Sequence, residues 1–172
     1  MTIATSRALL VPYTESLEHD FIVLNCCSTN RAEMNGSHSI KSAKHQFKEL
    51  LEGELHFSRA VLDSRTREYI GHLSILLVDG QYELTYLIDK AHWGKGIASE
   101  VLRPFFSLAC FELGINEVIA TVNAHHDASI KLLKKLGFVY QATKKDTFGP
   151  YYLYQFLDGK TSTSYVAVAQ SA

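Results

Sequence analysis

Two glycines of this sequence have a spacing that suits the binding of a phosphate group. Gly94 and Gly96 lie in the segment YELTYLIDKAHWGKGIASEVL, residues 82–102, between a strand-like run and a helix-like run. A glycine-rich turn that leads from a strand into a helix presents unpaired backbone N–H groups at the positive end of the helix. The segment is therefore predicted to bind a phosphate-containing ligand through its backbone.

Two common kinds of nucleotide site do not fit this turn. A P-loop has the pattern G-x-x-x-x-G-K-S/T, and Ile97 and Ala98, not a Lys-Ser or Lys-Thr pair, come directly after Gly96. A dinucleotide-binding turn has the pattern G-x-G-x-x-G and an acidic residue at the end of the next strand. Here Ser99 takes the place of the third glycine and Asn123 ends the next strand. The pyrophosphate of coenzyme A remains as a third ligand class.

The elements that must position this turn can be predicted from the pattern of apolar residues. Runs rich in β-branched and aromatic residues predict three neighbouring antiparallel strands, LHFSRAVLD, YIGHLSILLV and YELTYLI. Helical spacing predicts a helix over about 97–113, and Pro104 inside it is expected to cause a kink or a local break. A strand NEVIATVN follows, then a helix DASIKLLKKL with Asp127 as its N-cap, and a closing hairpin of FVYQATKK and YYLYQF.

The residues before these strands predict a short strand and two helices. SRALLVPY reads as the strand, and TESLEHDFIVLNCC and IKSAKHQFKELLEG read as helices separated by a polar loop over residues 28–39. The last segment, residues 158–172, is predicted to be a tail or an extra edge strand, and residues 1–157 a single domain.

Composition narrows the class of protein. The chain has 172 residues, 47% of them hydrophobic and 20% charged, which fits one well-buried domain. A formal net charge of -1 gives no basic field that would attract nucleic acid or an anionic membrane. The three cysteines have no metal-ligand spacing and are expected to be reduced thiols in a cytoplasmic protein. No apolar run is long enough to span a bilayer or to form a signal peptide, so we expect neither membrane insertion nor secretion.

The glycine turn resembles the acetyl-CoA site of the GNAT N-acetyltransferase superfamily. The pattern of that site, Q/R-x-x-G-x-G/A, maps onto residues 93–98, with Trp93 in place of Gln or Arg. Tryptophan followed by Gly-Lys-Gly is similar to the RimJ/RimL-like ribosomal-protein N-acetyltransferase branch. The segments SRALLVPY, ELTYLI and NAHHDASIKLLKKLGF also resemble that branch, so the resemblance extends from about Ser6 to Phe156.

The resemblance implies an α/β GNAT fold, in which helices flank a mixed, mostly antiparallel central sheet. The fourth and fifth strands of that fold, here residues 82–88 and 117–122, are expected to splay apart and to admit acetyl-CoA. No metal is implied. The residues implied to contact the cofactor are Leu87, Ile88, Trp93, Gly94, Lys95, Gly96, Ile97, Ala98, Asn123, His126 and Ser129.

Transfer of acetyl from a thioester to an amine needs a neutral amine, a donor for the oxyanion and a proton for the departing thiolate. Many members of the family use a tyrosine as the acid, at a position that is Leu133 here, and the resemblance implies Ser129 instead. The alternative is that Ser129 only caps its helix. Glu83 is the candidate base, or else a solvated strand carboxylate. Further candidates in the loop and hairpin are His125, His126, Asp146 and Tyr151.

The acceptor is expected to be a primary amine that attacks the thioester directly, and the resemblance favours a protein N-terminus of the ribosomal type. An α-amine with a pKa of about 7.7 to 8.0 is roughly one-tenth to one-fifth neutral at pH 7, whereas a lysine amine is neutral about once in 2,500. The alternatives are a small amine (a polyamine, an aminoglycoside or an amino acid) and a non-catalytic acyl-CoA sensor. A monomer or a homodimer is expected, with no direct contact to nucleic acid.

Overall fold

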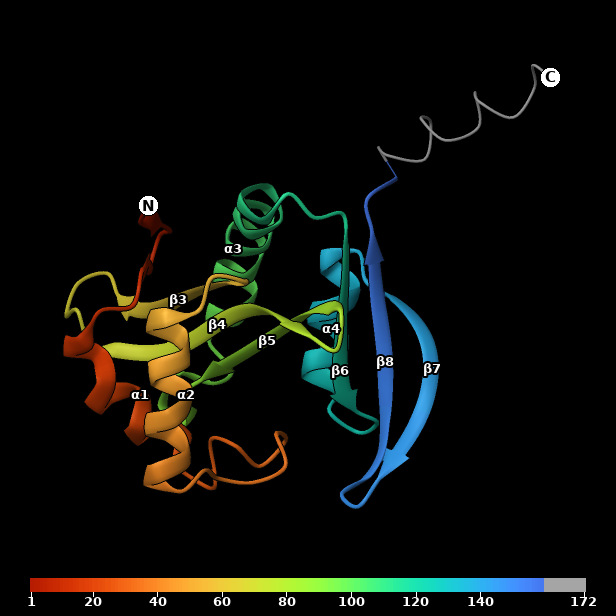
Figure 1. The fold of residues 1–172 in the computed structure, drawn as a ribbon, viewed down its shortest axis with the longest axis horizontal. Coiled ribbons are helices and arrows are strands. Elements are labelled where there is room, and N and C mark those ends of the chain that lie inside the picture. Colours follow the sequence, from red (N-terminus) through yellow and green to blue (C-terminus); the bar gives the residue numbers. More distant parts are fainter. Residues whose placement is uncertain (160–172) are drawn as a thin grey trace.

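A twisted eight-stranded sheet forms the centre of the protein in a computed structural model that describes residues 1–159 (Figure 1). From one edge to the other the strands are β1 Ile3–Ala4, β2 Ala8–Val11, β3 His56–Asp63, β4 Tyr69–Val78, β5 Gln81–Ile88, β6 Glu117–Asn123, β8 Gly149–Leu157 and β7 Val139–Asp146. The helices are α1 Glu18–Asn25, α2 Ile40–Glu52, α3 Ile97–Leu113 and α4 Asp127–Leu136, with short 3₁₀ turns at Glu15–Leu17 and Lys90–His92. This is the mixed α/β architecture that the sequence predicts.

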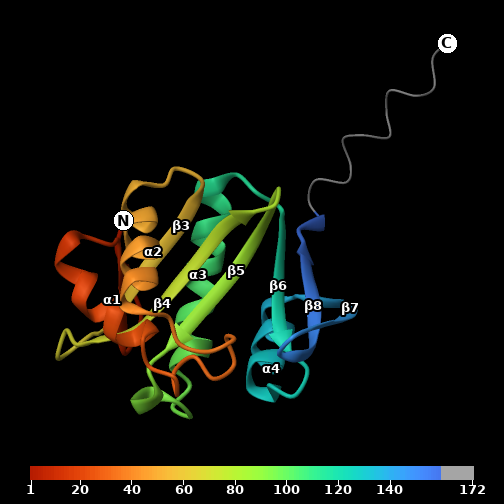
Figure 2. The ribbon, with the colours of Figure 1, turned by 60° about the horizontal axis from the view of Figure 1, so that its bottom comes forward.

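The sheet opens between β5 and β6. All other neighbouring strands are antiparallel, whereas these two are parallel and share a single register pair, Glu83 with Ile119. Figure 2 shows β5 and β6 close at one end and diverging toward the other. The predicted splay of these strands is therefore confirmed, and the wide end of the gap lies where β5 leads into the glycine turn.

Helices cover both faces of the sheet. His72 of β4 contacts the ring of Phe21 in α1, while the next residue, Leu73, belongs to the core that contains Val101 and Phe105 of α3. Since successive residues of a strand point to opposite faces, α1 and α3 cover opposite sides. Burial of these apolar side chains is the main force that fixes the helices around the gap.

Two details of the helices differ from expectation. Of the kink or local break expected at Pro104, the break is wrong, because α3 continues through Pro104 while Val101, Phe105 and Ala109 stay fully buried; the kink stays a prediction. The predicted N-cap of α4 is also wrong, because His126 occupies that position and Asp127 is the first helical residue, with no side-chain capping bond. The short strand β1 was not predicted, and the predicted tail falls mostly on residues 160–172, outside the described residues.

Candidate active site

The glycine turn enters α3 through two residues with left-handed backbone conformations. Gly94 and Gly96 have φ values of 71° and 75°, and Gly96 is the N-cap of the helix. Glycine adopts such angles without steric cost because it has no Cβ. Arg7 holds the turn from outside: its guanidinium donates to the Lys95 carbonyl oxygen at 2.7 Å and to a Glu100 carboxylate oxygen at 2.7 Å. The helix N-terminus is thus presented in a fixed position.

A cavity of about 610 Å³ lies against this turn and against the first turn of α4. We call it the glycine-turn groove. It is lined by nine of the eleven residues expected to contact the cofactor: Leu87, Ile88, Trp93, Gly94, Gly96, Ile97, Ala98, His126 and Ser129. The apolar walls and the amide-rich end fit a ligand that has a long neutral arm and a phosphate-bearing end. The residues present therefore fit coenzyme A.

The other two expected cofactor residues, Lys95 and Asn123, do not line this groove. The Lys95 ammonium group donates to the Ala91 carbonyl oxygen at 2.9 Å, and Lys95 does not line the groove. Asn123 lines a different cavity, where its amide donates to a Glu33 carboxylate oxygen at 2.8 Å. Sequence spacing could not show the Asn123 contact, since Asn123 and Glu33 are 90 positions apart and meet only in the folded chain.

Trp93 forms one wall of the groove and is not a core residue. Its indole N–H donates to the Ile88 carbonyl oxygen at 2.7 Å, while 48% of the residue surface remains exposed. The bond joins the end of β5 to the glycine turn. Trp93 therefore sets the spacing between the two backbone segments that border the groove.

A second cavity, of about 350 Å³, lies between β5 and β6, and we call it the inter-strand cavity. Three carboxylates line it, from Glu33, Glu83 and Asp146, against one arginine, Arg31, and one histidine, His126. The Arg31 guanidinium already donates to the Gly36 carbonyl oxygen at 2.8 Å and to two further oxygens. The charge of the cavity thus favours a positively charged ligand.

Glu83 is the best placed proton acceptor of this cavity. It is half-buried, and the Thr121 hydroxyl donates to one of its carboxylate oxygens at 3.2 Å. Burial raises the pKa of Glu83 above its ordinary value, and the Thr121 hydrogen bond partly opposes that shift. The result is a carboxylate that is more basic than an exposed one.

The two cavities meet at five residues that line both: Glu33, Met34, Tyr86, His126 and Ser129. Ser129 is only 8% exposed, and its hydroxyl is hydrogen-bonded to the Tyr86 hydroxyl. Ser129 therefore lies inside the junction and not on a solvated helix end. Tyr86 was not predicted as a site residue, although it lies three positions after Glu83 on the same strand.

A loop from Cys26 to Ser39 covers the junction. Asn30, which is buried, donates to the Asp89 carboxylate at 3.0 Å and accepts from the Lys90 backbone N–H at 2.8 Å. Farther along the loop, Glu33 accepts the Asn123 bond from β6. The loop is thereby attached to both sides of the gap, which its polar sequence alone did not indicate.

The remaining candidate residues of the loop and the hairpin differ in the cavities that they line. His125 lines neither cavity, whereas His126 lines both. Asp146 and Tyr151 line the inter-strand cavity, and the Asp146 carboxylate accepts the Phe148 backbone N–H at 2.8 Å. The hairpin residues therefore contribute to the wall of the second cavity.

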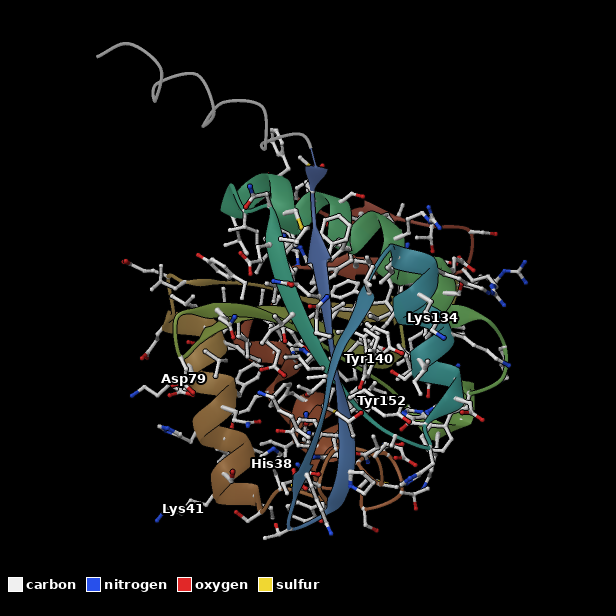
Figure 3. All side chains as sticks on the ribbon, turned by 90° about the vertical axis from the view of Figure 1, so that its right-hand side faces the viewer. His38, Lys41, Asp79, Lys134, Tyr140 and Tyr152 are labelled. Carbon is white, nitrogen blue, oxygen red and sulfur yellow. The ribbon has the colours of Figure 1, made fainter. Side chains whose placement is uncertain are left out.

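The lysines of α4 also separate into two groups. Lys131 and Lys135 line the glycine-turn groove. Figure 3 shows Lys134 on the same helix, where it is exposed and lines neither cavity. Two lysines one helical turn apart thus add positive charge to the groove.

A sheet opened between two strands, beside a glycine turn and a groove that fits coenzyme A, is the arrangement expected of a GNAT acetyltransferase domain. The chain belongs to the GNAT acetyltransferase family, since residues 7–139 match the acetyltransferase (GNAT) domain. GNAT domains use acetyl-CoA, and the fit of the groove agrees with this. Within residues 1–159, no helix is both long and apolar enough to cross a bilayer.

Similar proteins include an uncharacterized N-acetyltransferase p20 from Bacillus licheniformis, 33% identical over 90 residues, which are 51% of each chain. The chain thus aligns with about half the length of the curated relatives that it matches. A spermidine N-acetyltransferase from Vibrio cholerae, solved with CoA and spermine, has a TM-score of 0.77 at 14% identity over 88% of this chain and 96% of that one. A ribosomal-protein-S5-alanine acetyltransferase from Vibrio fischeri has a TM-score of 0.75 at 16% identity over 93% and 98%. These structures show that the fold is shared.

Proposed function

We propose that this protein acetylates a protein N-terminal α-amine, as enzymes of the RimJ/RimL-like branch do. The observation that carries the proposal is the acidic inter-strand cavity, which opens onto the glycine-turn groove at Ser129. An amine is positively charged before it reacts, so an acidic cavity attracts it to the place where the acyl group would be delivered. The matching fold of a ribosomal-protein acetyltransferase supports the choice of acceptor.

In this proposal the groove holds acetyl-CoA, which supplies the activated acetyl group as a thioester. The backbone amides at Gly96, Ile97 and Ala98 would bind the pyrophosphate at the positive end of α3. Leu87 and Ile88 would border the pantetheine arm along the open edge of β5. Lys131 and Lys135 would face the phosphate of the ribose.

Glu83 accepts the proton that the amine must lose. An α-amine needs only modest help, since a substantial fraction of it is neutral near pH 7. A carboxylate with a raised pKa and a connection to solvent can provide that help, directly or through one water. Ser129, on the other side of the junction, donates the proton that the leaving sulfur requires.

A polyamine is the second candidate acceptor. Three carboxylates line the inter-strand cavity, and several positive charges on one small molecule would complement them. The fold shared with a spermidine N-acetyltransferase agrees with this alternative. An α-amine remains the first choice because it requires the weaker base.

Thiol release from acetyl-CoA tests the proposal. The purified protein would be given N-terminal peptides of ribosomal proteins in one series, and polyamines, aminoglycosides and amino acids in another. Release with the peptides is the expected result. Release with a small amine alone would replace the proposed acceptor, and tight acetyl-CoA binding without release in either series would identify a non-catalytic sensor.

A further inference from the structure

The serine at the junction needs a partner to act as an acid. A serine hydroxyl is a far weaker acid than a thiol, whose pKa is about 8.5, so Ser129 cannot give up its proton unless another group replaces it at once. The position at which many family members place an acidic tyrosine is Leu133, which is 1% exposed and has no hydroxyl. The proton must therefore come from another residue next to Ser129.

Tyr86 reaches Ser129 from the opposite wall of the junction. Its hydroxyl is hydrogen-bonded to the Ser129 hydroxyl and lies 3.5 Å from the Ser129 carbonyl oxygen. A phenol, with a pKa of about 10, is much closer in acidity to a thiol than serine is. Burial raises the pKa of Tyr86, and its hydrogen bond with Ser129 partly opposes that rise, so the phenol keeps its proton at neutral pH.

The strand geometry separates this donor from the base. Tyr86 and Glu83 are three residues apart on β5, and residues an odd number of positions apart on a strand face opposite sides because successive side chains alternate. Tyr86 points toward α4 and Ser129, while Glu83 points toward Thr121 on the other side of the gap. Proton removal from the amine and proton delivery to the sulfur can then occur without direct exchange between the two groups.

We infer that Tyr86 is the proton source for Ser129, a role that rests on the proposed acetyl transfer. As the carbon–nitrogen bond forms and the carbon–sulfur bond breaks, Ser129 donates its hydroxyl proton to the leaving sulfur and takes the phenol proton of Tyr86. Glu83 takes one proton from the amine. The Tyr86 phenolate regains a proton from solvent and Glu83 releases one, so protons and charge balance over one turnover.

Replacement of a single hydroxyl tests this role. Tyr86→Phe keeps the ring that packs on the core, and Tyr82→Phe is the matched control, because Tyr82 packs on the same core and lines neither cavity. With the amine that the wild type accepts, Tyr86→Phe should lower kcat about 10²-fold, the scale of lost acid catalysis. The KM for acetyl-CoA should change less than about twofold, and Tyr82→Phe should behave as the wild type.

The pH profile distinguishes a proton source from a residue that only positions Ser129. In the wild type, kcat should fall at alkaline pH as the Tyr86 phenol ionises, and this decrease should be absent in Tyr86→Phe. A purely positioning role would lower kcat by the same factor at every pH and would keep the alkaline decrease, which would overturn the inference.

A measurement on the ligand-free protein tests the coupling without turnover. With tyrosine labelled at the ζ-carbon, the resonance lost in Tyr86→Phe identifies Tyr86 in an NMR titration. The pKa of Tyr86 should lie above the ordinary tyrosine range. It should be higher still in Ser129→Ala, because the hydrogen bond with Ser129 lowers the pKa of Tyr86. An ordinary pKa that Ser129→Ala leaves unchanged would refute the pairing.

The two proposals fail in different ways. A wild type that releases thiol, together with a Tyr86→Phe variant of equal kcat, overturns only the role of Tyr86. A wild type that releases no thiol with any amine overturns the proposed function, and the NMR titration still decides whether Tyr86 and Ser129 are coupled. Thermal unfolding of each variant confirms that it is folded before either conclusion is drawn.

Discussion

At the scale of single residues, the site depends on which side chains the sheet turns toward the gap. Glu83 is turned toward Thr121 and away from the α4 side, where Tyr86 meets Ser129. The sequence alone supports Glu83 and Ser129 as candidates. Tyr86 was missed because its partner lies 43 positions away, and only the packing of α4 against the open sheet brings the hydroxyls together.

Glu83→Gln should remove the base while keeping the size of the side chain. We expect kcat to fall about 10²-fold, since a positioned base contributes on this scale. In the wild type, activity should decrease as the pH falls through the raised pKa of Glu83, because the protonated acid cannot accept a proton. This acidic decrease should be absent from the pH–rate profile of the variant.

Glu117→Gln is the control for that experiment. Glu117 lies on the neighbouring strand, is exposed, and lines neither cavity. It should keep the rate and the pH profile of the wild type. Equal losses in both variants would mean that general negative charge, and not a specific base, supports the reaction.

At the scale of elements, the glycine turn acts through its backbone. Gly96→Glu should lose CoA affinity, because a side chain and a negative charge would enter at the N-terminus of α3, where φ is 75°. Gly80→Glu is a matched control, since Gly80 has a φ of 80° in the β4–β5 turn, outside both cavities. Both should lose about 1 kcal/mol of stability from backbone strain.

Calorimetric titration with CoA separates strain from binding. Only Gly96→Glu should show no measurable heat of CoA binding, while thermal unfolding should show similar destabilisation in both variants. CoA binding by Gly96→Glu at wild-type affinity would contradict the placement of the pyrophosphate.

The lysine pair of α4 offers a test on one helix. Lys131→Ala combined with Lys135→Ala should weaken CoA binding several-fold, because each exposed ion pair contributes about 0.2 to 1 kcal/mol. Lys134→Ala, on the outer side, should change little. The decisive comparison is dephospho-CoA, which lacks the 3′-phosphate: its affinity should be the same in the double variant and in the wild type.

Much of the framework could be predicted from local pattern. The α3 helix occupies the predicted residues, and its end at Gly114, with a φ of 62°, follows the ordinary chemistry of helix ends. The predicted N-cap of α4 at Asp127 is wrong by one residue, because His126 is the N-cap and Asp127 already belongs to the helix. Arg7 and Asn30 could not be predicted as supports of the site, because their bonds join segments 59 or more positions apart.

At the scale of the whole molecule, the loop over the junction joins two halves of a divided sheet. Asn30 attaches it to the end of β5, and the bond from Asn123 to Glu33 attaches it to β6. The first attachment is partly buried and the second is exposed. Opening of the loop is therefore expected to start at the β6 side.

Asn123→Ala should release that side of the loop. We expect a higher KM for the amine, little change in CoA affinity, and faster hydrogen exchange over residues 31–36. Asn30→Ala should instead lower the unfolding temperature, because the half-buried Asp89 carboxylate and the Lys90 backbone N–H both lose the hydrogen bond that Asn30 makes with them. Equal amine KM values in Asn123→Ala and the wild type would show that this bond does not govern access.

The single register pair between β5 and β6 also affects how the chain avoids aggregation. Beyond the pair of Glu83 and Ile119, β5 and β6 each have an unpaired edge inside the sheet. Exposed strand edges are templates for pairing with other chains. These two edges face each other beneath the covering loop, so a flat foreign strand has little room to add. A narrow, extended ligand can enter the gap between β5 and β6, whereas a strand of another protein cannot. The narrow gap therefore limits both aggregation and the shape of the molecules that can bind in it.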